Sequence, residues 1–451
     1  YSFYLRLMYS SDFGKDFLWG VATAAAQIEG AASAYGKGPS IWDTFSKKPG
    51  KIKKGHKPDE ACDFYHRYEQ DIAMVKTLGF KVFRMSIAWS RIFPLGDGTV
   101  NAEGVAFYHK VIDECLKNDL IPMVTLYHWD LPEALSKEGG WTAYGINNAF
   151  NEYALFCAKE YGDKVKQWIV INEPFGFTSL GYMLGVHAPG LTGVTNFFEA
   201  ALHTAIAQAD GAKILRAEVN QAVIGTAFSC SEIVPYSHSD QDVMIAKRTD
   251  ILMNRFFLEP ALGLGFPTGN WDVLEKFAIS YSTWRHQSRM AFDFDFIGIQ
   301  NYFPLVIKYN AFIPVVQAWE VKAKSRKVPH TAMGWEINAD GFYRIIKQFA
   351  TYPQVKNIMI TENGAAFHDK LIDGKIEDGE RVDYFKAYLA AMLKAKNEGI
   401  NITGYLAWTL MDNFEWAEGY QARFGLVHND FKTQQRTIKQ SGYWWQEFLS
   451  K

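Results

Sequence analysis

The residues with the clearest chemical potential are two glutamates, each placed at the end of a short apolar run. The first run, Trp168-Ile169-Val170-Ile171, reads as a buried strand and leads into Asn172, Glu173 and Pro174. Pro174 cannot donate to a strand ladder, so the strand must end there. Burial raises the pKa of a carboxyl group, which makes Glu173 a candidate proton donor near neutral pH. On this stretch alone, Glu173 could equally cap the helix that follows.

The second glutamate, Glu362, lies in Thr361-Glu362-Asn363-Gly364, after a strand pattern at 357–360. Two carboxyl groups on opposite sides of a pocket suit the cleavage of a glycosidic bond, because one protonates the departing oxygen and the other stabilises or attacks the anomeric carbon. Their environments must differ. Arg84 and Tyr302 could supply the difference, since an arginine stays charged and keeps a neighbouring carboxylate ionised. The alternative for Arg84 is a buried structural ion pair.

Further polar and aromatic residues stand at the ends of other predicted strands. The full set is Gln27, Arg84, His128, Trp129, Asn172, Glu173, Asn301, Tyr302, Glu362, Asn363 and Trp408. In a parallel barrel the carboxyl ends of all strands meet at one face, so these side chains would converge on one pocket. Each is weak evidence alone, but the set predicts a binding and catalytic site.

Other kinds of site fit the sequence poorly. The eleven histidines include no H-x-H on a predicted strand and no H-E-x-x-H, so neither a metal nor another cofactor is predicted. The nucleophile motif G-x-S-x-G of a Ser-His-Asp site is absent. Cys62, Cys115, Cys157 and Cys230 have no metal-ligand spacing and are expected to be buried free thiols, the first three in helices.

The composition describes a globular chain with a high aromatic content. Of 451 residues, 48% are hydrophobic and 16% aromatic, and aromatic faces are one way to bind sugars. The formal net charge of −2, with both signs interspersed, predicts neither a nucleic-acid nor a membrane partner. No apolar run has the length of a membrane span, and the amino terminus lacks the apolar core of a signal peptide. Free cysteines favour a cytoplasmic location, while secretion stays open.

The elements that must position these residues alternate along the chain. Strands are predicted at 17–25, 81–89, 121–126, 168–171, 222–228, 295–299, 357–360 and 402–406. Helices are predicted at 58–78, 101–118 (with Asn101 as N-cap), 147–161, 196–219, 240–258, 340–351, 381–397 and 437–449. Eight strand–helix units predict one α/β domain over 1–451, a single (β/α)8 TIM barrel with long βα loops and a peripheral extension at 1–12. A doubly wound open sheet is the alternative, but no G-x-G-x-x-G follows a strand.

Several stretches also carry a family likeness. They are FLWGVATAAAQIEG (17–30), RMSIAWSRIFP (84–94), TLYHWDLP (125–132), INEP (171–174), HAPG (187–190), DFIGIQNYF (295–303), ITENG (360–364), WTLMDNFEWAEGY (408–420) and RFG (423–425). In this order they resemble the family-one glycoside hydrolases, which are retaining β-glucosidases and relatives on a (β/α)8 barrel. The resemblance extends over nearly the whole chain, from about residue 13 to 448.

The resemblance implies a role for each site residue. Glu173 would be the general acid/base and Glu362 the nucleophile, with Arg84 and Tyr302 holding Glu362 ionised and Asn172 binding the 2-hydroxyl of the sugar. The substrate-binding set would be completed by Gln27, His128, Trp129, Glu415 and Trp416 on the other hydroxyls, Trp408 under the ring and Trp335 at the aglycone entrance. A retaining mechanism predicts carboxyl groups roughly 5–5.5 Å apart.

The implied activity is exo-hydrolysis of small, unphosphorylated β-D-glucosides or cello-oligosaccharides, with β-galactosides and β-fucosides as further candidates. The Glu415-Trp416 pair matches the branch of the family that acts on unphosphorylated sugars. A transglycosidase and a non-catalytic sugar-binding relative are the alternatives, and a homo-oligomer is compatible with the sequence. Ala26, Phe303, Thr409 and the stretch 427–430 depart from the family pattern and leave the aglycone preference open.

Overall fold

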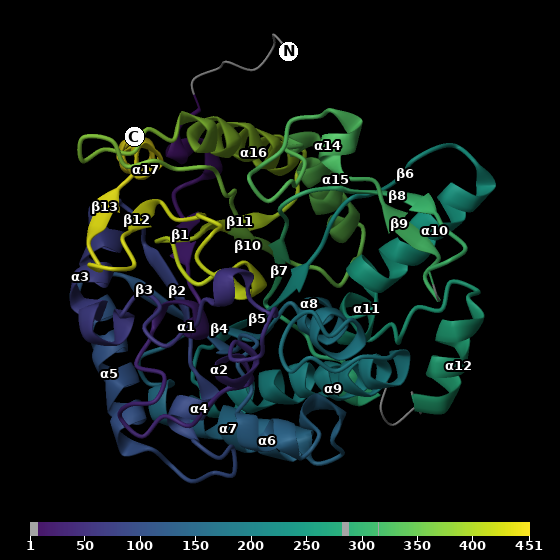
Figure 1. Ribbon diagram of the computed structural model, residues 1–451, viewed down its shortest axis with the longest axis horizontal. Helices are drawn as coiled ribbons and strands as arrows, with labels where there is room; N and C mark the ends of the chain where they lie inside the picture. The colour runs from purple at the N-terminus through teal and green to yellow at the C-terminus, as the bar shows by residue number, and fades with distance from the viewer. Residues whose placement is uncertain (1–7, 282–287, 314) are drawn as a thin grey trace.

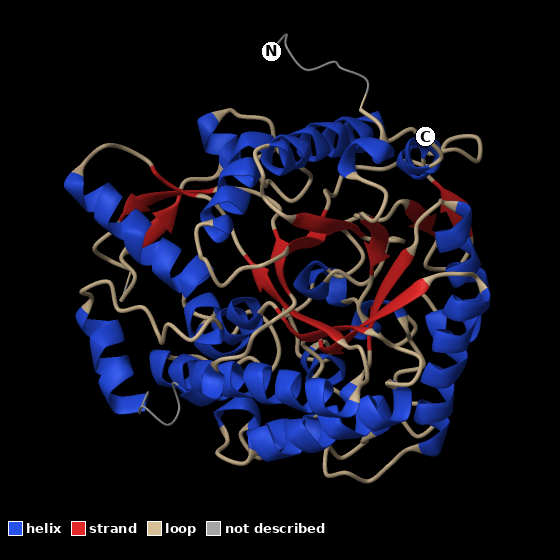
Figure 2. Ribbon diagram, turned by 180° about the vertical axis from the view of Figure 1, so that it is seen from behind, coloured by secondary structure: helices blue, strands red, loops and turns tan. Residues whose placement is uncertain are grey.

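Eight parallel strands form a closed barrel at the centre of the computed structural model, which describes residues 8–281, 288–313 and 315–451. The order around the barrel is β1-β11-β10-β7-β5-β4-β3-β2, and the pairing of β2 with β1 closes the ring. Figure 2 shows the strands as a ring surrounded by helices. The barrel strands are β1 (Leu18–Ala22), β2 (Val82–Ser86), β3 (Ile121–Tyr127), β4 (Gln167–Asn172), β5 (Val223–Ser229), β7 (Phe296–Gln300), β10 (Ile358–Asn363) and β11 (Ile402–Trp408). The predicted (β/α)8 barrel is confirmed, and the open sheet is excluded.

Long helices pack around the outside of the ring (Figure 1). They are α3 (Phe64–Thr77), α5 (Ala102–Lys117), α7 (Ile146–Tyr161), α9 (Val194–Glu218), α10 (Asp240–Asp250), α12 (Asp272–Tyr281), α15 (Ala339–Ala350), α16 (Gly379–Asn397) and α17 (Gln440–Leu449). Shorter helices occupy the loops: α1 (Ala25–Ile28), α2 (Ile41–Phe45), α4 (Trp89–Ile92), α6 (Glu133–Lys137), α8 (Pro174–Thr178), α11 (Leu258–Ala261) and α14 (Ala323–Arg326). The short helices α1, α4 and α8 follow barrel strands directly and extend the wall of the barrel mouth.

Three predicted helices differ from the observed ones. The helix expected at 58–78 begins only at Phe64, and Cys62 therefore lies before it rather than within it. The helix expected at 240–258 divides into α10, a π-helical turn at Ile251–Arg255 and α11. The helix expected at 437–449 begins at Gln440, because β13 (Arg436–Ile438) pairs with β12 (Val427–Asn429) in a hairpin that sequence analysis did not predict.

The capping role predicted for Asn101 is also wrong. Asn101 precedes α5, but its side chain makes no capping bond. Its amide instead donates to the backbone oxygens of Tyr35 and Arg91 at 2.8 and 3.0 Å. Asn101 therefore ties the loop after β1 to α4, so its amide satisfies loop carbonyls rather than helix N–H groups.

A small three-stranded sheet lies outside the barrel and was not predicted. It contains β6 (Ile233–Pro235), β8 (Leu305–Tyr309) and β9 (Ala318–Glu320), in the order β6-β8-β9. α10 packs against it, as Figure 1 shows at the right of the molecule. The long loops after β5 and β7 are thus partly folded by pairing with each other.

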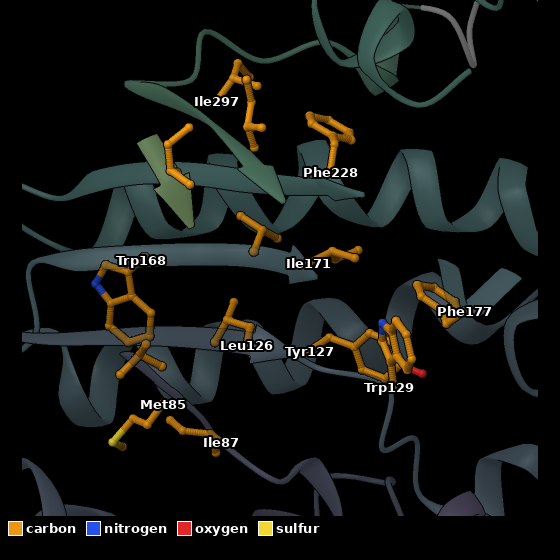
Figure 3. Close-up of a cluster of buried hydrophobic side chains, with 14 of the residues drawn as sticks. Met85, Ile87, Leu126, Tyr127, Trp129, Trp168, Ile171, Phe177, Phe228 and Ile297 are labelled. Carbon is orange, nitrogen blue, oxygen red and sulfur yellow. The ribbon is translucent and has the colours of Figure 1, made fainter. Parts of the chain in front are cut away.

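The core has two layers separated by the barrel wall. Inside the ring, Val82, Met123 and Ile169 pack together among other apolar residues from the strands. Outside it, side chains of the same strands pack against the helices, and Figure 3 shows Trp168 and Leu126 in this layer. Strand residues alternate between the two faces, which explains why the strands read as continuous apolar runs.

The amino-terminal extension predicted at 1–12 is described only from residue 8, so residues 1–7 of that prediction lie outside the described residues. Ser10–Phe13 form a 3-10 turn, and Phe13 packs against Phe17 and Trp19 at ring-centroid distances of 5.2 and 4.9 Å. All four cysteines are free and buried, as expected. No helix in the described part of the chain has the length and apolarity needed to span a membrane.

Candidate active site

A cavity of about 370 Å³ lies at the carboxyl ends of the barrel strands. Glu173, which follows β4 directly, and Glu362 on β10 both line it. Seven more predicted residues line it as well: His128, Trp129, Tyr302, Trp335, Trp408, Glu415 and Trp416. Gln27, Arg84 and Asn172 are fully buried and contact lining residues through hydrogen bonds. The predicted residues are therefore gathered at one site.

Irregular registers turn polar side chains of two strands into the barrel. Met359 on β10 points into the barrel interior, so strict alternation would send Glu362 outward. The register with β7 shifts between Ile360 and Glu362, and Glu362 faces inward as a result. On β4, the register with β5 shifts between Ile169 and Asn172. Both irregularities lie next to the site, where β-bulges commonly re-aim a side chain.

Glu362 is held by three donors. Its Oε1 accepts from Arg84 Nη1 at 2.7 Å and from Gln300 Nε2 at 2.8 Å, and its Oε2 accepts from the Tyr302 hydroxyl at 2.8 Å. Burial raises the pKa of Glu362, but the charge of Arg84 and the hydrogen bond from Tyr302 oppose that rise. The pKa of Glu362 remains raised, and the three donors stabilise its ionised form against the cost of burial.

Glu173 lies in a different environment. Burial raises its pKa well above the ordinary value, and the negative charge of Glu362 raises it further, against a hydrogen bond from Ser229. Glu173 lies at the N-cap position of α8, yet its side chain makes no capping bond, and its backbone is left-handed with φ of 47°. The alternative that Glu173 caps the helix is therefore wrong. The environment of Glu173 favours its protonated form, whereas the donors around Glu362 stabilise its ionised form.

Asn172 joins the two halves of the site. Its Oδ1 accepts from Arg84 Nη2 at 2.5 Å and from Gln300 Nε2 at 2.7 Å, so its Nδ2 must be the donor to His128 Nε2 at 3.1 Å. His128 therefore carries its proton on Nδ1, and burial holds its pKa well below the ordinary value. Trp129 Nε1 donates to the Asn172 backbone oxygen at 3.0 Å, so this indole offers the cavity its ring rather than its N–H.

A third carboxyl group lies on the wall of the cavity that is formed by the loop after β11. Glu415 Oε2 accepts from Gln27 Nε2 at 3.3 Å. Burial raises the pKa of Glu415 to about 8, with a further contribution from the charge of Glu362. Next to it, Trp416 stacks on Trp129 with ring centroids 4.8 Å apart. This wall combines hydrogen-bonding groups with flat apolar faces, which is the combination a sugar ring requires.

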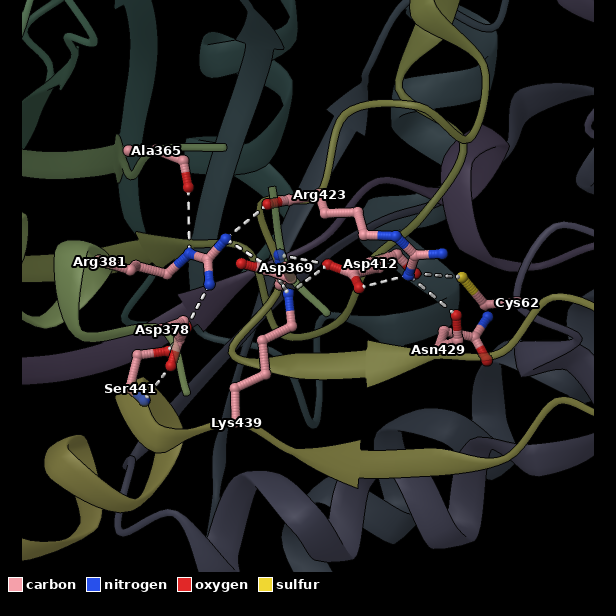
Figure 4. Close-up of polar contacts among 11 residues, drawn as sticks. Cys62, Ala365, Asp369, Asp378, Arg381, Asp412, Arg423, Asn429, Lys439 and Ser441 are labelled. Atoms are coloured by element: carbon pink, nitrogen blue, oxygen red, sulfur yellow. Dashed lines mark hydrogen bonds and ion pairs between the residues drawn. The ribbon is translucent and has the colours of Figure 1, made fainter. Parts of the chain in front are cut away.

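A buried ion network fixes the loop that carries Glu415 (Figure 4). Lys439 Nζ donates to Asp412 Oδ1 at 2.7 Å and to Asp369 at 2.5 Å. Arg423 donates to Asp412 Oδ2 at 2.8 Å. Burial alone would raise the pKa of Asp412, but Lys439 and Arg423 hold it below the ordinary value. Because Asp412 is only three residues before Glu415, the network positions the binding wall.

Two residues of the predicted set face away from the cavity, and one important residue was missed. Asn301 Nδ2 donates to the Cys230 oxygen, and Asn363 Nδ2 donates to the Asn301 oxygen and to Tyr384 behind the barrel wall. Gln300, which binds both Asn172 and Glu362, was not assigned a role. Strand alternation could have found it, since Phe296 on the same strand points inward and Gln300 is four residues further on.

The described residues contain no group of three or more His, Cys, Asp or Glu side chains that could hold a metal ion. The cavity is lined by carboxyl groups together with aromatic and imidazole side chains.

Comparison with known proteins shows which family the chain resembles. The family model for glycosyl hydrolase family 1 matches residues 9–451. β-Glucosidase A of Thermotoga maritima is 40% identical over 442 residues, covering 96% of each chain. β-Glucosidase A of Acetivibrio thermocellus is 41% identical over 441 residues, covering 97% of this chain and 98% of the relative.

Solved structures agree with the sequence relatives. The family 1 β-glucosidase from Thermotoga maritima superposes with a TM-score of 0.91 at 39% identity and 97% coverage of both chains. The AHE enzyme from Alicyclobacillus herbarius superposes with a TM-score of 0.93 at 38% identity and 96% coverage of both. The likeness thus extends over the whole barrel and its long loops.

Proposed function

The chain belongs to glycosyl hydrolase family 1, and from this premise we propose that Glu173 and Glu362 hydrolyse β-D-glucosides by double displacement. The protein is a glycoside hydrolase of the retaining β-glucosidase type. Its substrate is a small-molecule glycoside, in keeping with the deoxynojirimycin complex of the Thermotoga maritima enzyme. Hydrolysis of unphosphorylated β-glucosides, including cellobiose, is the proposed reaction.

In the first step, the ionised Glu362 attacks the anomeric carbon while Glu173 protonates the departing oxygen. The bond to the aglycone breaks, and a covalent glycosyl-enzyme forms on Glu362. In the second step, Glu173, now ionised, takes a proton from water as the water oxygen attacks the same carbon. The sugar leaves with its β configuration, and Glu173 has regained its proton.

The observation that carries this division of roles is the unequal hydrogen bonding of the two carboxyl groups. Glu362 accepts from Arg84, Gln300 and Tyr302, which stabilise its negative charge. Glu173 forms no ion pair within the described residues, and burial together with the charge of Glu362 raises its pKa against the opposing charge of Arg84, which keeps its proton bound. A nucleophile must be ionised and an acid must be protonated at the same pH, and this asymmetry provides both states.

We propose that the remaining residues bind the sugar. Nδ2 of Asn172 has a second hydrogen beyond the one given to His128, and that hydrogen is available for the 2-hydroxyl. The other hydroxyls are assigned to His128, Glu415 and Gln27, whose Oε1 has no hydrogen-bond partner among the described residues. The stacked rings of Trp129 and Trp416 form one side of the sugar site, and Trp408 lies under the ring. Trp335 borders the aglycone.

The alternatives drawn from the sequence are not favoured. A non-catalytic sugar-binding relative has no need for two carboxyl groups with opposed environments, and no feature of the cavity points to an acceptor sugar in place of water. Association into homo-oligomers and a cytoplasmic location remain predictions; the four buried free thiols are consistent with a reducing compartment.

Azide rescue tests the assignment of the nucleophile. Glu362→Ala should abolish hydrolysis of aryl β-glucosides, and azide should restore turnover by attacking the anomeric carbon through the space that the carboxylate leaves. The rescued product should be the α-glucosyl azide, because only one displacement has occurred. Rescue of Glu173→Ala should instead give the β-glucosyl azide, and the reverse pattern would exchange the two roles.

A further inference from the structure

The outer part of the cavity differs in character from the inner part. Its rim is formed by half-buried apolar side chains: Phe175, Leu180, Met253, Phe303, Met333 and Trp335. We name these six residues the apolar collar. Most polar groups assigned to the sugar are more fully buried, namely those of Gln27, His128, Asn172, Glu173 and Glu362, whereas Glu415 is half-buried like the collar. The part of a substrate beyond the glycosidic oxygen would therefore leave the polar floor and meet the collar.

The collar is built by three long βα loops. Phe175 and Leu180 follow β4, Met253 follows β5, and Phe303 and Met333 follow β7. Leu180 lies in a π-helical turn at Ser179–Met183, and Met253 lies in the other one, at Ile251–Arg255. π-Helical turns are rare and occur frequently at functional sites. Here, both turns bring an apolar side chain to the same opening.

Two polar groups at the edge of the collar, Ser179 and Glu418, are engaged within the protein, while His187 has no hydrogen-bond partner for its Nδ1 among the described residues. The Ser179 hydroxyl donates to the Phe175 oxygen at 2.6 Å. Glu418 forms an ion pair with Lys53 at 2.5 Å. His187 packs against the rings of Trp42 and Trp129, with centroid distances of 5.3 and 5.8 Å, and burial lowers its pKa to about 4, so it is a neutral ring.

We propose that the apolar collar selects the leaving group, so that alkyl and aryl β-glucosides are better substrates than β-glucosides whose aglycone is a second glucose. This inference rests on the proposed function and names the substrate class of that site.

The physical reason is desolvation. A second glucose carries several hydroxyl groups, which would lose water against Phe303, Met253 and Met333 and gain few partners there. An alkyl chain has no such cost and gains about 0.8 kcal/mol for each methylene fully removed from water. The ring of Trp335 stacks on Phe303, with centroids 4.7 Å apart, and provides a flat surface against which an aryl group can pack.

The test compares leaving groups of similar chemistry, so that intrinsic reactivity does not decide the result. kcat/KM is measured for methyl β-D-glucoside, hexyl β-D-glucoside and cellobiose, whose leaving groups are all aliphatic alcohols. We expect kcat/KM for hexyl β-glucoside to exceed that for methyl β-glucoside by at least about tenfold, which corresponds to about 1.4 kcal/mol. Complete burial of about two of the five additional methylenes would supply this free energy. Cellobiose should fall below the hexyl compound.

Collar variants tie the preference to these side chains. Met253→Gln and Met333→Gln keep side-chain length while adding a polar amide, and together they should lower the hexyl-to-methyl ratio at least threefold without lowering kcat/KM for methyl β-glucoside to the same degree. Met244→Gln is the matched control, because Met244 lies exposed on α10 and does not line the cavity. It should leave all three values unchanged.

The possible failures are distinguishable. Equal kcat/KM values for hexyl and methyl β-glucoside, a higher value for cellobiose, or a hexyl-to-methyl ratio that the two Gln substitutions leave unchanged would each overturn the role of the collar while leaving the hydrolase intact. Absence of turnover with all three compounds and with aryl β-glucosides would instead overturn the proposed function. Turnover of methyl β-glucoside by the variants shows that they are folded.

Discussion

Tyr302→Phe removes a single hydrogen bond from the proposed nucleophile. The hydroxyl of Tyr302 donates to Glu362 Oε2 at 2.8 Å, while Arg84 and Gln300 both bind Oε1. Oε2 therefore has no other donor among these three to replace Tyr302. A hydrogen bond to a charged group contributes about 1.5–3 kcal/mol, so losing it should lower kcat/KM about tenfold to a hundredfold near neutral pH.

The same substitution should shift the pH profile in one direction. The bond from Tyr302 opposes the rise in the pKa of Glu362, so removing it lets that pKa rise. Glu362 must be ionised to attack, and the acidic limb of kcat/KM should therefore move to higher pH. The alkaline limb, which reports the loss of the proton from Glu173, should move much less.

The assay is a pH series of kcat/KM for an aryl β-glucoside with the wild type and Tyr302→Phe. Tyr161→Phe is the matched control, because it also removes a buried hydroxyl, one that donates to the Val105 oxygen at 3.3 Å outside the site. It should lower stability slightly and leave both limbs in place. An acidic limb that stays fixed or moves to lower pH in Tyr302→Phe would refute the account of how Glu362 is kept ionised.

Three further substitutions probe other parts of the site. Gln300→Leu removes the donor shared by Asn172 and Glu362, so kcat/KM should fall about tenfold or more and the acidic limb should move to higher pH. An unchanged pH profile would mean that Arg84 alone suffices to keep Glu362 ionised. Lys439→Met leaves Asp369 and Asp412 buried without the cation that they share. The free energy of unfolding, measured by denaturant titration, should fall by about 3–5 kcal/mol, whereas a decrease below about 1 kcal/mol would show that the network contributes little to stability. Glu415 has a pKa raised to about 8, so the folded state keeps a proton that the unfolded state has lost between about pH 4.5 and 8, and stability falls as pH rises through that range. Glu415→Gln should remove this dependence, so its Tm relative to wild type should increase from pH 5 to pH 8; a constant difference would contradict the raised pKa.

The barrel could be predicted from the sequence because its signals are local. Apolar runs ending in polar residues mark the strands, and amphipathic patterns separated by glycine mark the helices. The prediction of one continuous helix at 240–258 was wrong because the apolar periodicity of this segment does not reveal the π-helical turn at Ile251–Arg255. The hairpin of β12 and β13 was not predicted because strands of three residues are too short to show a recognisable hydrophobic alternation.

Most of the residues that line the cavity could be predicted from the sequence, but Gln300 and the geometry of the site could not. Glu362 would face outward under strict alternation, and only the register shift against β7 places it inside the barrel. Such a shift depends on how two strands pair, which one strand's sequence does not contain. The left-handed backbone of Glu173, Trp129 and Trp416 is equally invisible in the sequence, although strained residues of this kind cluster at active sites.

The most direct test of the central claim is to trap the glycosyl-enzyme. An activated 2-deoxy-2-fluoro-β-D-glucoside forms the covalent intermediate and slows its hydrolysis, because the fluorine destabilises both transition states while the good leaving group restores the first step. Proteolysis and mass spectrometry should find one sugar per chain, attached to Glu362 in the peptide containing Thr361-Glu362-Asn363-Gly364. A label on Glu173 or Glu415, or rapid inactivation without a covalent sugar, would contradict the assignment of Glu362 as the nucleophile.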